Sequence, residues 1–229
     1  MKPSRIAAAA ALSLLAAACA SGGPGDGLGL RKLSWFSYLN ADDLKAVCKA
    51  GSPERVRLVL NADYAEHVRT YDLAVDDATG GGELVIRALP AANLADLNSG
   101  DVLGAWRGSR AVVKLTPKQT TALQGRITRS GAFEPLAAPL ALKSADFWWL
   151  VSGCHEGKGF VSAFPLAGGT EPPAFAAALK TLDKTGVAFP DLASRNRQAA
   201  RQPPRHPQDI DLSFTIRIGE NGLSGLLPH

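Results

Sequence analysis

The chain has little of what metal and thiol chemistry requires. Its 229 residues include three cysteines, four histidines and one methionine. The spacings His-x-His, Cys-x-x-Cys and His-Glu-x-x-His, from which transition-metal sites are commonly built, do not occur. We therefore expect no metal site and no cofactor.

The chain also lacks a long apolar run and a strong net charge. The apolar run that begins at Ile6 covers about ten to thirteen residues, whereas a membrane-spanning helix needs about 20. The formal net charge is +4, and loss of residues 1–18, which contain Lys2 and Arg5 but no acid, would reduce it by two, to +2. So small a charge predicts no capture of nucleic acid.

The N-terminal residues have the pattern of an export signal. Lys2 and Arg5 supply a positive start, residues 6–15 an apolar centre, and residues 16–18 the small side chains that a signal peptidase requires. We therefore expect residues 1–18 to be a signal peptide and the remaining chain to be exported.

With Cys19 included, residues 15–19 resemble the lipobox of bacterial lipoproteins. The resemblance covers about 20 residues and implies that Cys19 is acylated, becomes the first mature residue and attaches the protein to a membrane. The family usually has leucine three positions before the cysteine, where this chain has Ala16, with Leu15 one position earlier. Ala20 is not the aspartate of an inner-membrane retention signal, which implies the periplasmic face of the outer membrane in a cell with two membranes.

An ordinary secretory signal, cleaved near Ala18 or Ala20, is the alternative interpretation. In either case residues 19–32, which are rich in glycine and poor in large side chains, predict a flexible tether. The folded part is then residues 33–229, a length typical of one domain.

If Cys19 carries lipid, Cys48 and Cys154 are the two cysteines that remain. Exported chains mature where thiols oxidise, so we expect a Cys48–Cys154 disulfide. Closing a loop of roughly 100 residues stabilises a domain by about 4 to 5 kcal/mol in the chain-entropy model. The alternative is a reactive thiol at Cys154 beside His155.

Hydrophobic periodicity predicts a single α+β domain, an antiparallel sheet with two or three flanking helices. Residues 146–151 are apolar on both faces, as in a central strand, whereas residues 56–60 alternate as in a strand with one buried face. Asn40 and Thr116 are expected helix N-caps. The expected strands are residues 56–60, 67–76, 83–89, 102–106, 110–115, 146–151, 160–164 and 209–218, the last closing the sheet; the expected helices are 41–48, 117–129 and 172–184; residues 135–145 are expected to form a loop.

Trp148 and Trp149 are a candidate binding face. Adjacent strand residues point in opposite directions, so one ring could face a partner, and tryptophan gives a large contact area at low entropic cost. Packing of both rings in the core is the alternative. The polar side chains of Glu66, His67 and Arg69 suit either a cleft or an exposed strand end.

Residues 190–208 are basic, with Arg195, Arg197, Arg201 and Arg205 among Gln, Pro and small side chains. We expect a mobile loop, either solvated or in contact with anionic lipid, lipopolysaccharide or an acidic partner.

Two glycine-containing segments are candidates for catalytic motifs, and neither has the required residues. Gly80 to Gly82 lack the Lys-Ser/Thr partner of a phosphate loop, and the sequence at 222–225 lacks the five-residue spacing of a nucleophile elbow. We therefore expect an envelope lipoprotein that acts as a non-catalytic binding or assembly accessory, with an envelope protein as partner. The alternative is an envelope hydrolase whose site is assembled only in the fold.

Overall fold

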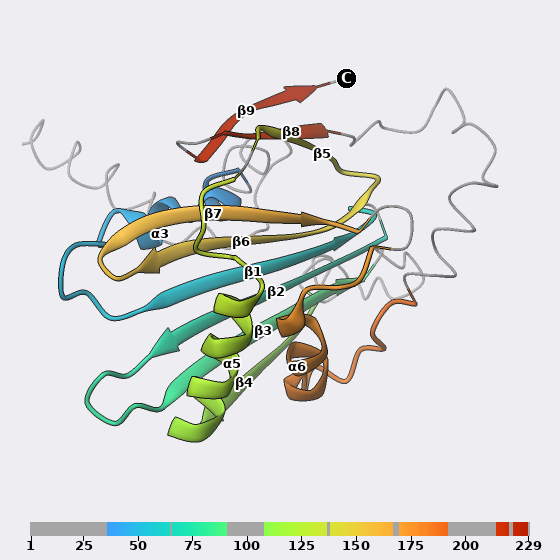
Figure 1. The fold of residues 1–229 in the computed structure, drawn as a ribbon. Coiled ribbons are helices and arrows are strands. Elements are labelled where there is room, and N and C mark those ends of the chain that lie inside the picture. Colours follow the sequence, from blue (N-terminus) through green and yellow to red (C-terminus); the bar gives the residue numbers. More distant parts are fainter. Residues whose placement is uncertain are drawn as a thin grey trace, which may run out of the picture. The chain divides into compact units, whose positions relative to one another are not determined.

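Six antiparallel strands form the main sheet of the protein, in the order β4-β3-β2-β1-β6-β7 (Figure 1). The computed structural model describes residues 36–64, 66–90, 108–136, 138–166, 170–191, 214–219 and 222–228. The strands of the main sheet are β1 (Arg55–Ala62), β2 (His67–Val75), β3 (Gly82–Pro90), β4 (Ser109–Leu115), β6 (Phe147–His155) and β7 (Lys158–Pro165). Together with the helices described below, this mostly antiparallel arrangement is compatible with the expected α+β class, although strands dominate the described residues.

The expected strands at residues 56–60, 67–76 and 83–89 are present as β1, β2 and β3, which pair as an antiparallel meander. The burial of β1, however, differs from the one buried face that its sequence predicts. Seven of its eight residues are buried, so both faces are covered, not one. The reason is its position: β1 lies between β2 and β6, in the middle of the sheet. Polar residues such as Arg57 and Asn61 alternate along β1 and are buried. The Arg57 guanidinium donates to Asp72, and the Asn61 amide nitrogen donates to the carbonyl oxygen of Ser144.

A hairpin turn that contains Gly80 joins β2 and β3. Asp76 accepts hydrogen bonds from the backbone of Ala78 (3.0 Å) and the hydroxyl of Thr79 (2.7 Å). Gly80 has a φ of 68°, a conformation that is strained for residues with a Cβ. These local bonds fix the register in which β3 returns along β2.

A second, three-stranded sheet has the order β5-β8-β9. It consists of β5 (Leu140–Lys143), β8 (Phe214–Gly219) and β9 (Gly222–Pro228). The sequence prediction was wrong here on two counts: residues 140–143 form a strand, and the described part of the expected last strand pairs with β5 instead of closing the main sheet. The short β5 is specified by burial of Leu142 with Ile216 and Ile218, a long-range contact that local periodicity does not show.

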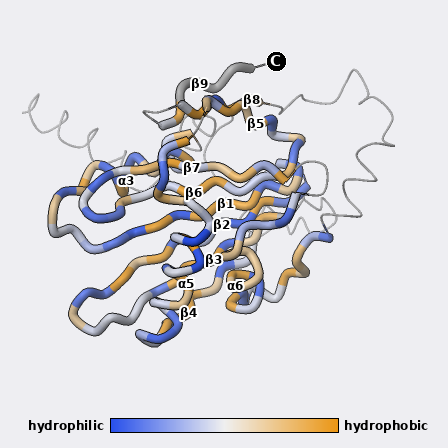
Figure 2. Tube along the Cα trace, in the orientation of Figure 1, coloured by the Kyte–Doolittle hydropathy of each residue, from blue (hydrophilic) through white to orange (hydrophobic). Residues whose placement is uncertain are grey.

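Two helices cover one face of the main sheet, α5 (Pro117–Arg129) and α6 (Ala174–Leu182) (Figure 1). Both were expected. Thr116 caps α5 and forms a capping box with Gln119. Figure 2 shows α5 as mainly hydrophilic and α6 as mainly hydrophobic, so α5 contributes a narrow buried stripe, Leu123 and Ile127, to the core.

The opposite face of β6 and β7 contacts the short helix α3 (Asp42–Lys45), which follows a helical turn at residues 36–40. The expected N-cap at Asn40 is wrong, because the N-cap residue is Ala41, with a left-handed φ of 54° and no side-chain bond. The Asn40 side chain instead accepts hydrogen bonds from Lys45 Nζ (2.9 Å) and from the backbone of Leu223 (3.2 Å). Asn40 therefore links α3 to β9.

Candidate binding surface

The two adjacent tryptophans of β6 lie in the interior. Trp148 is 0% exposed and Trp149 is 1% exposed. The indole nitrogen of Trp148 donates to the carbonyl oxygen of Lys143 at 2.8 Å, and Trp149 packs edge-on against Phe175 of α6. The hypothesis that one ring faces a partner is therefore wrong, and the alternative, that both rings pack in the core, is confirmed.

The disulfide between Cys48 and Cys154 is present, with the two Cα atoms 5.5 Å apart and a sequence separation of 106. It joins the loop after α3 to the end of β6. The alternative, a free thiol at Cys154, is therefore wrong for this structure. The neighbouring His155 has other partners: its Nδ1 is 2.9 Å from Glu54 Oε2, and its ring stacks on Phe133 at 3.6 Å.

Arg69 is the centre of a buried polar cluster on the helix-covered face. The Arg69 residue is 0% exposed. Its side chain forms an ion pair with Asp183, which follows α6. Its Nε donates to His67 at 2.8 Å, and its Nη2 donates to the carbonyl oxygens of Val187 (2.6 Å) and Ala188 (2.8 Å). The cluster fastens the segment after α6 to β2.

The ionisation states of this cluster follow from its contacts. Burial disfavours the charged form of Asp183, but hydrogen bonds from Thr185 and the charge of Arg69 outweigh it and hold the pKa of Asp183 below its ordinary value. Burial, followed by the charge of Asp183, raises the pKa of Tyr71. Buried charges are tolerated when they are paired and hydrogen-bonded in this way.

The structure separates the three polar residues singled out in the sequence, Glu66, His67 and Arg69. His67 and Arg69 are buried, at 3% and 0% exposure, whereas Glu66 is exposed. The three side chains therefore do not share a cleft, and they do not form an exposed strand end. Both interpretations from the sequence are wrong. Charged residues seldom lie in a core without partners. Apart from His67, the partners of Arg69 come from residues more than 110 positions away.

Arg57 is the centre of a second cluster, on the opposite face. It donates to Asp72 at 2.6 Å and, through both terminal nitrogens, to Asp43 at 2.9 and 3.0 Å, and its guanidinium lies 3.6 Å from the centre of the Tyr38 ring. The Tyr38 hydroxyl donates to Asp72 at 2.9 Å. Burial is the largest cause of a raised pKa at Tyr38. This cluster holds residues 36–45 against the sheet.

A hollow of about 280 Å³ lies where the C-terminus of α5, the end of β7 and the N-terminus of α6 meet. Phe164, Pro165 and Pro173 are among its mainly apolar lining residues. Its one serine is engaged, because Ser130 Oγ donates to Arg126 (3.0 Å) and accepts from the Ala174 backbone (3.0 Å). That hydroxyl is a structural link between α5 and α6.

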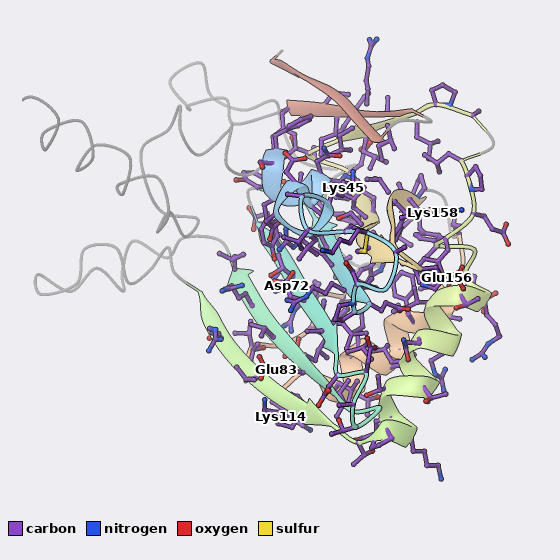
Figure 3. The ribbon with its side chains drawn as sticks, turned by 90° about the vertical axis from the view of Figure 1, so that its left-hand side faces the viewer. Lys45, Asp72, Glu83, Lys114, Glu156 and Lys158 are labelled. Atoms are coloured by element: carbon purple, nitrogen blue, oxygen red, sulfur yellow. A yellow bond between two sulfur atoms is a disulfide. The ribbon has the colours of Figure 1, made fainter. Side chains whose placement is uncertain are left out.

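The face of β3 and β4 that points away from the helices is half-buried along β3 and exposed along β4. Three cross-strand pairs lie on it, in successive rows: Glu83 with Lys114, Val85 with Val112, and Arg87 with Arg110. Figure 3 shows Glu83 and Lys114 on the side of the sheet away from α5. Val112 is 42% exposed, and it is one of two large hydrophobic side chains with high exposure among the described residues, the other being Val47.

Charge is distributed unevenly over this face. Lys114 forms an ion pair with Glu83, and its hydrogen bond and charge lower the pKa of Glu83. Arg87 lies 3.6 Å from Asp72. Arg110, directly opposite Arg87, is exposed and has no ion pair with any described residue. The charge of Arg110 contributes to lowering the pKa of Glu83, but like charges directly opposite each other destabilise a strand pair, so Arg110 can gain from an added anion.

This surface was missed in the sequence analysis. The alternating charges of residues 110–114 were visible, but they are typical of any half-exposed strand. Only the register shows that Arg110 faces Arg87 and not an acid.

Several other predictions lie outside the described residues. They concern Cys19, the signal peptide, the tether of residues 19–32, the strand at 102–106 and most of the basic segment at 190–208.

No family model, no curated protein and no solved structure matches this chain. Among the described residues, no helix is long and apolar enough to cross a membrane. The same part of the chain contains no group of three or more His, Cys, Asp or Glu side chains arranged to hold a metal ion.

Proposed function

We propose that this protein is a lipoprotein of the bacterial cell envelope, anchored by lipid on Cys19, whose folded domain acts as a non-catalytic binding or assembly accessory for another envelope protein. In a cell with two membranes, its place is the periplasmic face of the outer membrane. The signal-like residues 1–18 and the lipobox-like residues ending at Cys19 support the anchor.

The disulfide supports export. Disulfides persist in oxidising compartments and are rare in the cytosol. The Cys48–Cys154 bond joins two residues separated by 106 positions; Cys154 is 2% exposed and Cys48 is half-buried.

The exposed face of β3 and β4 is the observation that carries the binding function. It combines an apolar centre, Val85 and Val112, with charged rows on either side. The two buried arginine clusters, by contrast, are occupied in holding the fold together. A surface with an apolar centre and a polar rim is typical of a protein interface.

The anchor is tested by metabolic labelling with a fatty acid. We expect label in the wild-type protein and none in Cys19→Ser, which lacks the thiol that would be acylated. Label that persists in the serine variant would contradict the anchor. Fractionation of the two membranes tests the sorting, and recovery of the wild type with the inner membrane would contradict it.

The binding function is tested by affinity purification from detergent-solubilised membranes, followed by mass spectrometry. The control is an unrelated domain fused to residues 1–35 of this chain, which carries the same anchor and tether. We expect a specific envelope protein to be enriched with the full chain and not with the control. Equal recovery of every protein with both baits would contradict the function.

A further inference from the structure

We propose that the outer edge of β4 receives an extended segment of a partner protein as an additional strand, and that this segment has the pattern acidic-x-apolar-x-acidic. The inference rests on the proposed binding function and names the partner's chemistry. It follows from the position of β4, from the register of β3 and β4, and from the charges on their exposed face.

β4 is the terminal strand of the main sheet and pairs with β3 on one side only among the described strands. The opposite terminal strand, β7, contacts β8 and β9 of the second sheet and ends at Pro165, which cannot donate a ladder hydrogen bond. An edge strand presents backbone donors and acceptors that an extended peptide can pair with.

The alternation of side chains along β4 determines which of them would lie beside each residue of a bound peptide. Successive side chains of a strand alternate between faces, so residues i, i+2 and i+4 of an added strand lie beside Arg110, Val112 and Lys114 on the exposed face. A carboxylate beside Arg110 would give Arg110 an ion-pair partner, as Asp72 does for Arg87. An apolar residue would cover Val112, and a second carboxylate would lie beside Lys114, which is 80% exposed at its side chain.

A second copy of this chain fits the same edge poorly. Antiparallel pairing of two β4 strands about Val112 places Arg110 of each opposite Lys114 of the other, so both charged rows become repulsive. Charged edge residues are a common means of preventing such self-association. The acidic segment of a different protein meets the same charges with the opposite sign.

The test uses the full-length chain in detergent and two fluorescent peptides. One contains Glu-Thr-Val-Thr-Glu flanked by threonines, and the other has lysine in place of both glutamates. By fluorescence anisotropy at low ionic strength we expect the acidic peptide to bind at least about tenfold more tightly than the basic one, since two cross-strand charge pairs change from attractive to repulsive. Raising the salt concentration should reduce the difference.

Charge reversal of the protein provides the matched variant. In Arg110→Glu with Lys114→Glu the preference should reverse, so that the basic peptide binds more tightly, while the thermal unfolding temperature changes little. The milder pair Arg110→Gln with Lys114→Gln should show little preference, which covers the case in which charge reversal disturbs the fold. Lys118→Glu, an exposed residue of α5, is the control that should change nothing.

Pairing through the backbone is tested separately. N-methylation of the alternate amides that face β4 should abolish binding of the acidic peptide, whereas methylation of the other set should preserve it. Equal binding of the acidic and basic peptides, no effect of charge reversal, concentration-dependent dimerisation through β4, or equal tolerance of both methylation patterns would each overturn the proposal.

Failure of this inference is distinguishable from failure of the proposed function. If the charge-reversed chain still recovers the wild-type partner from membranes, the domain binds a partner but not through β4. If the acidic peptide binds as expected and no envelope protein is enriched over the anchored control, the edge is competent and the proposed function is wrong.

Discussion

β6 and β4 belong to the same sheet but have opposite surroundings. Eight of the nine residues of β6 are buried, whereas β4 alternates between half-buried and exposed residues before ending at the buried Leu115. The tryptophans that made β6 a candidate binding strand are packed between layers, and the less conspicuous β4 carries the exposed Val112 between charges. Large aromatic side chains in a strand thus indicated the centre of the core here, and the candidate interface depends on charge and register.

The largest expected effect is at the tryptophans. Replacing Trp148 or Trp149 by alanine should each lower the free energy of unfolding by about 3 to 5 kcal/mol, the usual cost of truncating a buried aromatic side chain. Val112→Ala, a matched change at an exposed strand position, should cost less than about 1 kcal/mol. Denaturant unfolding measures the free energy of unfolding of all three variants. A loss of less than about 1 kcal/mol in the Trp148 variant would contradict the burial of this side chain and the difference between β6 and β4.

Loss of the disulfide should have the next largest effect. Cys48→Ser, Cys154→Ser and the double variant should each lose about 2 to 5 kcal/mol, and the three losses should be similar because each removes the same bond. Peptide mapping without reductant should recover the crosslinked pair from the exported protein. Two free thiols in that sample would contradict the bond.

The two buried arginine clusters can be compared with a matched pair of substitutions. Asp183→Asn removes the charged partner of Arg69 at a side chain that is 6% exposed, and should cost about 1.5 to 3 kcal/mol. Asp43→Asn removes a partner of Arg57 at a side chain that is 59% exposed, and should cost less than about 1 kcal/mol. Similar losses from both would show that burial does not determine the strength of these pairs.

Acid should remove the difference between wild type and Asp183→Asn. The pKa of Asp183 is lower in the folded protein than its ordinary value, so its contribution is present above about pH 4 and is lost as the pH falls through the folded pKa. Unfolding curves of the two proteins should therefore converge below about pH 4. A constant difference down to about pH 2 would contradict this.

The smallest effect on stability is expected at the β4 face. Arg110→Glu with Lys114→Glu should change the free energy of unfolding by about 1 kcal/mol or less, since both side chains are exposed. A large loss of stability would show that this row is structural and would weaken the distinction between β4 and β6.

Much of the fold was predictable from local signals. The meander, the cap and Pro117 of α5, the helix at α6 and the apolar strand β6 each followed from periodicity or capping chemistry, and the disulfide followed from having two cysteines left in an exported chain. What local signals missed depends on distant contacts. β5 is specified by its pairing with β8, and the burial of Arg69 is specified by Asp183 and the carbonyls after α6.

The candidate site was less predictable than the fold. Arg110 and Arg87 are 23 positions apart, and nothing in either segment indicates that they face each other. Trp148 and Trp149, by contrast, are conspicuous in the sequence because the core requires large apolar side chains. The residues that are most conspicuous in the sequence, Trp148 and Trp149, therefore belong to the core of this fold and not to the candidate site.

Hydrogen exchange along β4 tests the central claim most directly. In the full-length chain, the amides of β4 should exchange faster than those of β6, because β4 is an edge strand that is half-buried on one face and exposed on the other. Addition of the acidic peptide should slow exchange at residues 109–115 and leave β6 and β7 unchanged, and the basic peptide should slow it at neither. Unchanged exchange at β4, or equal protection by both peptides, would contradict β4 as the recognition edge.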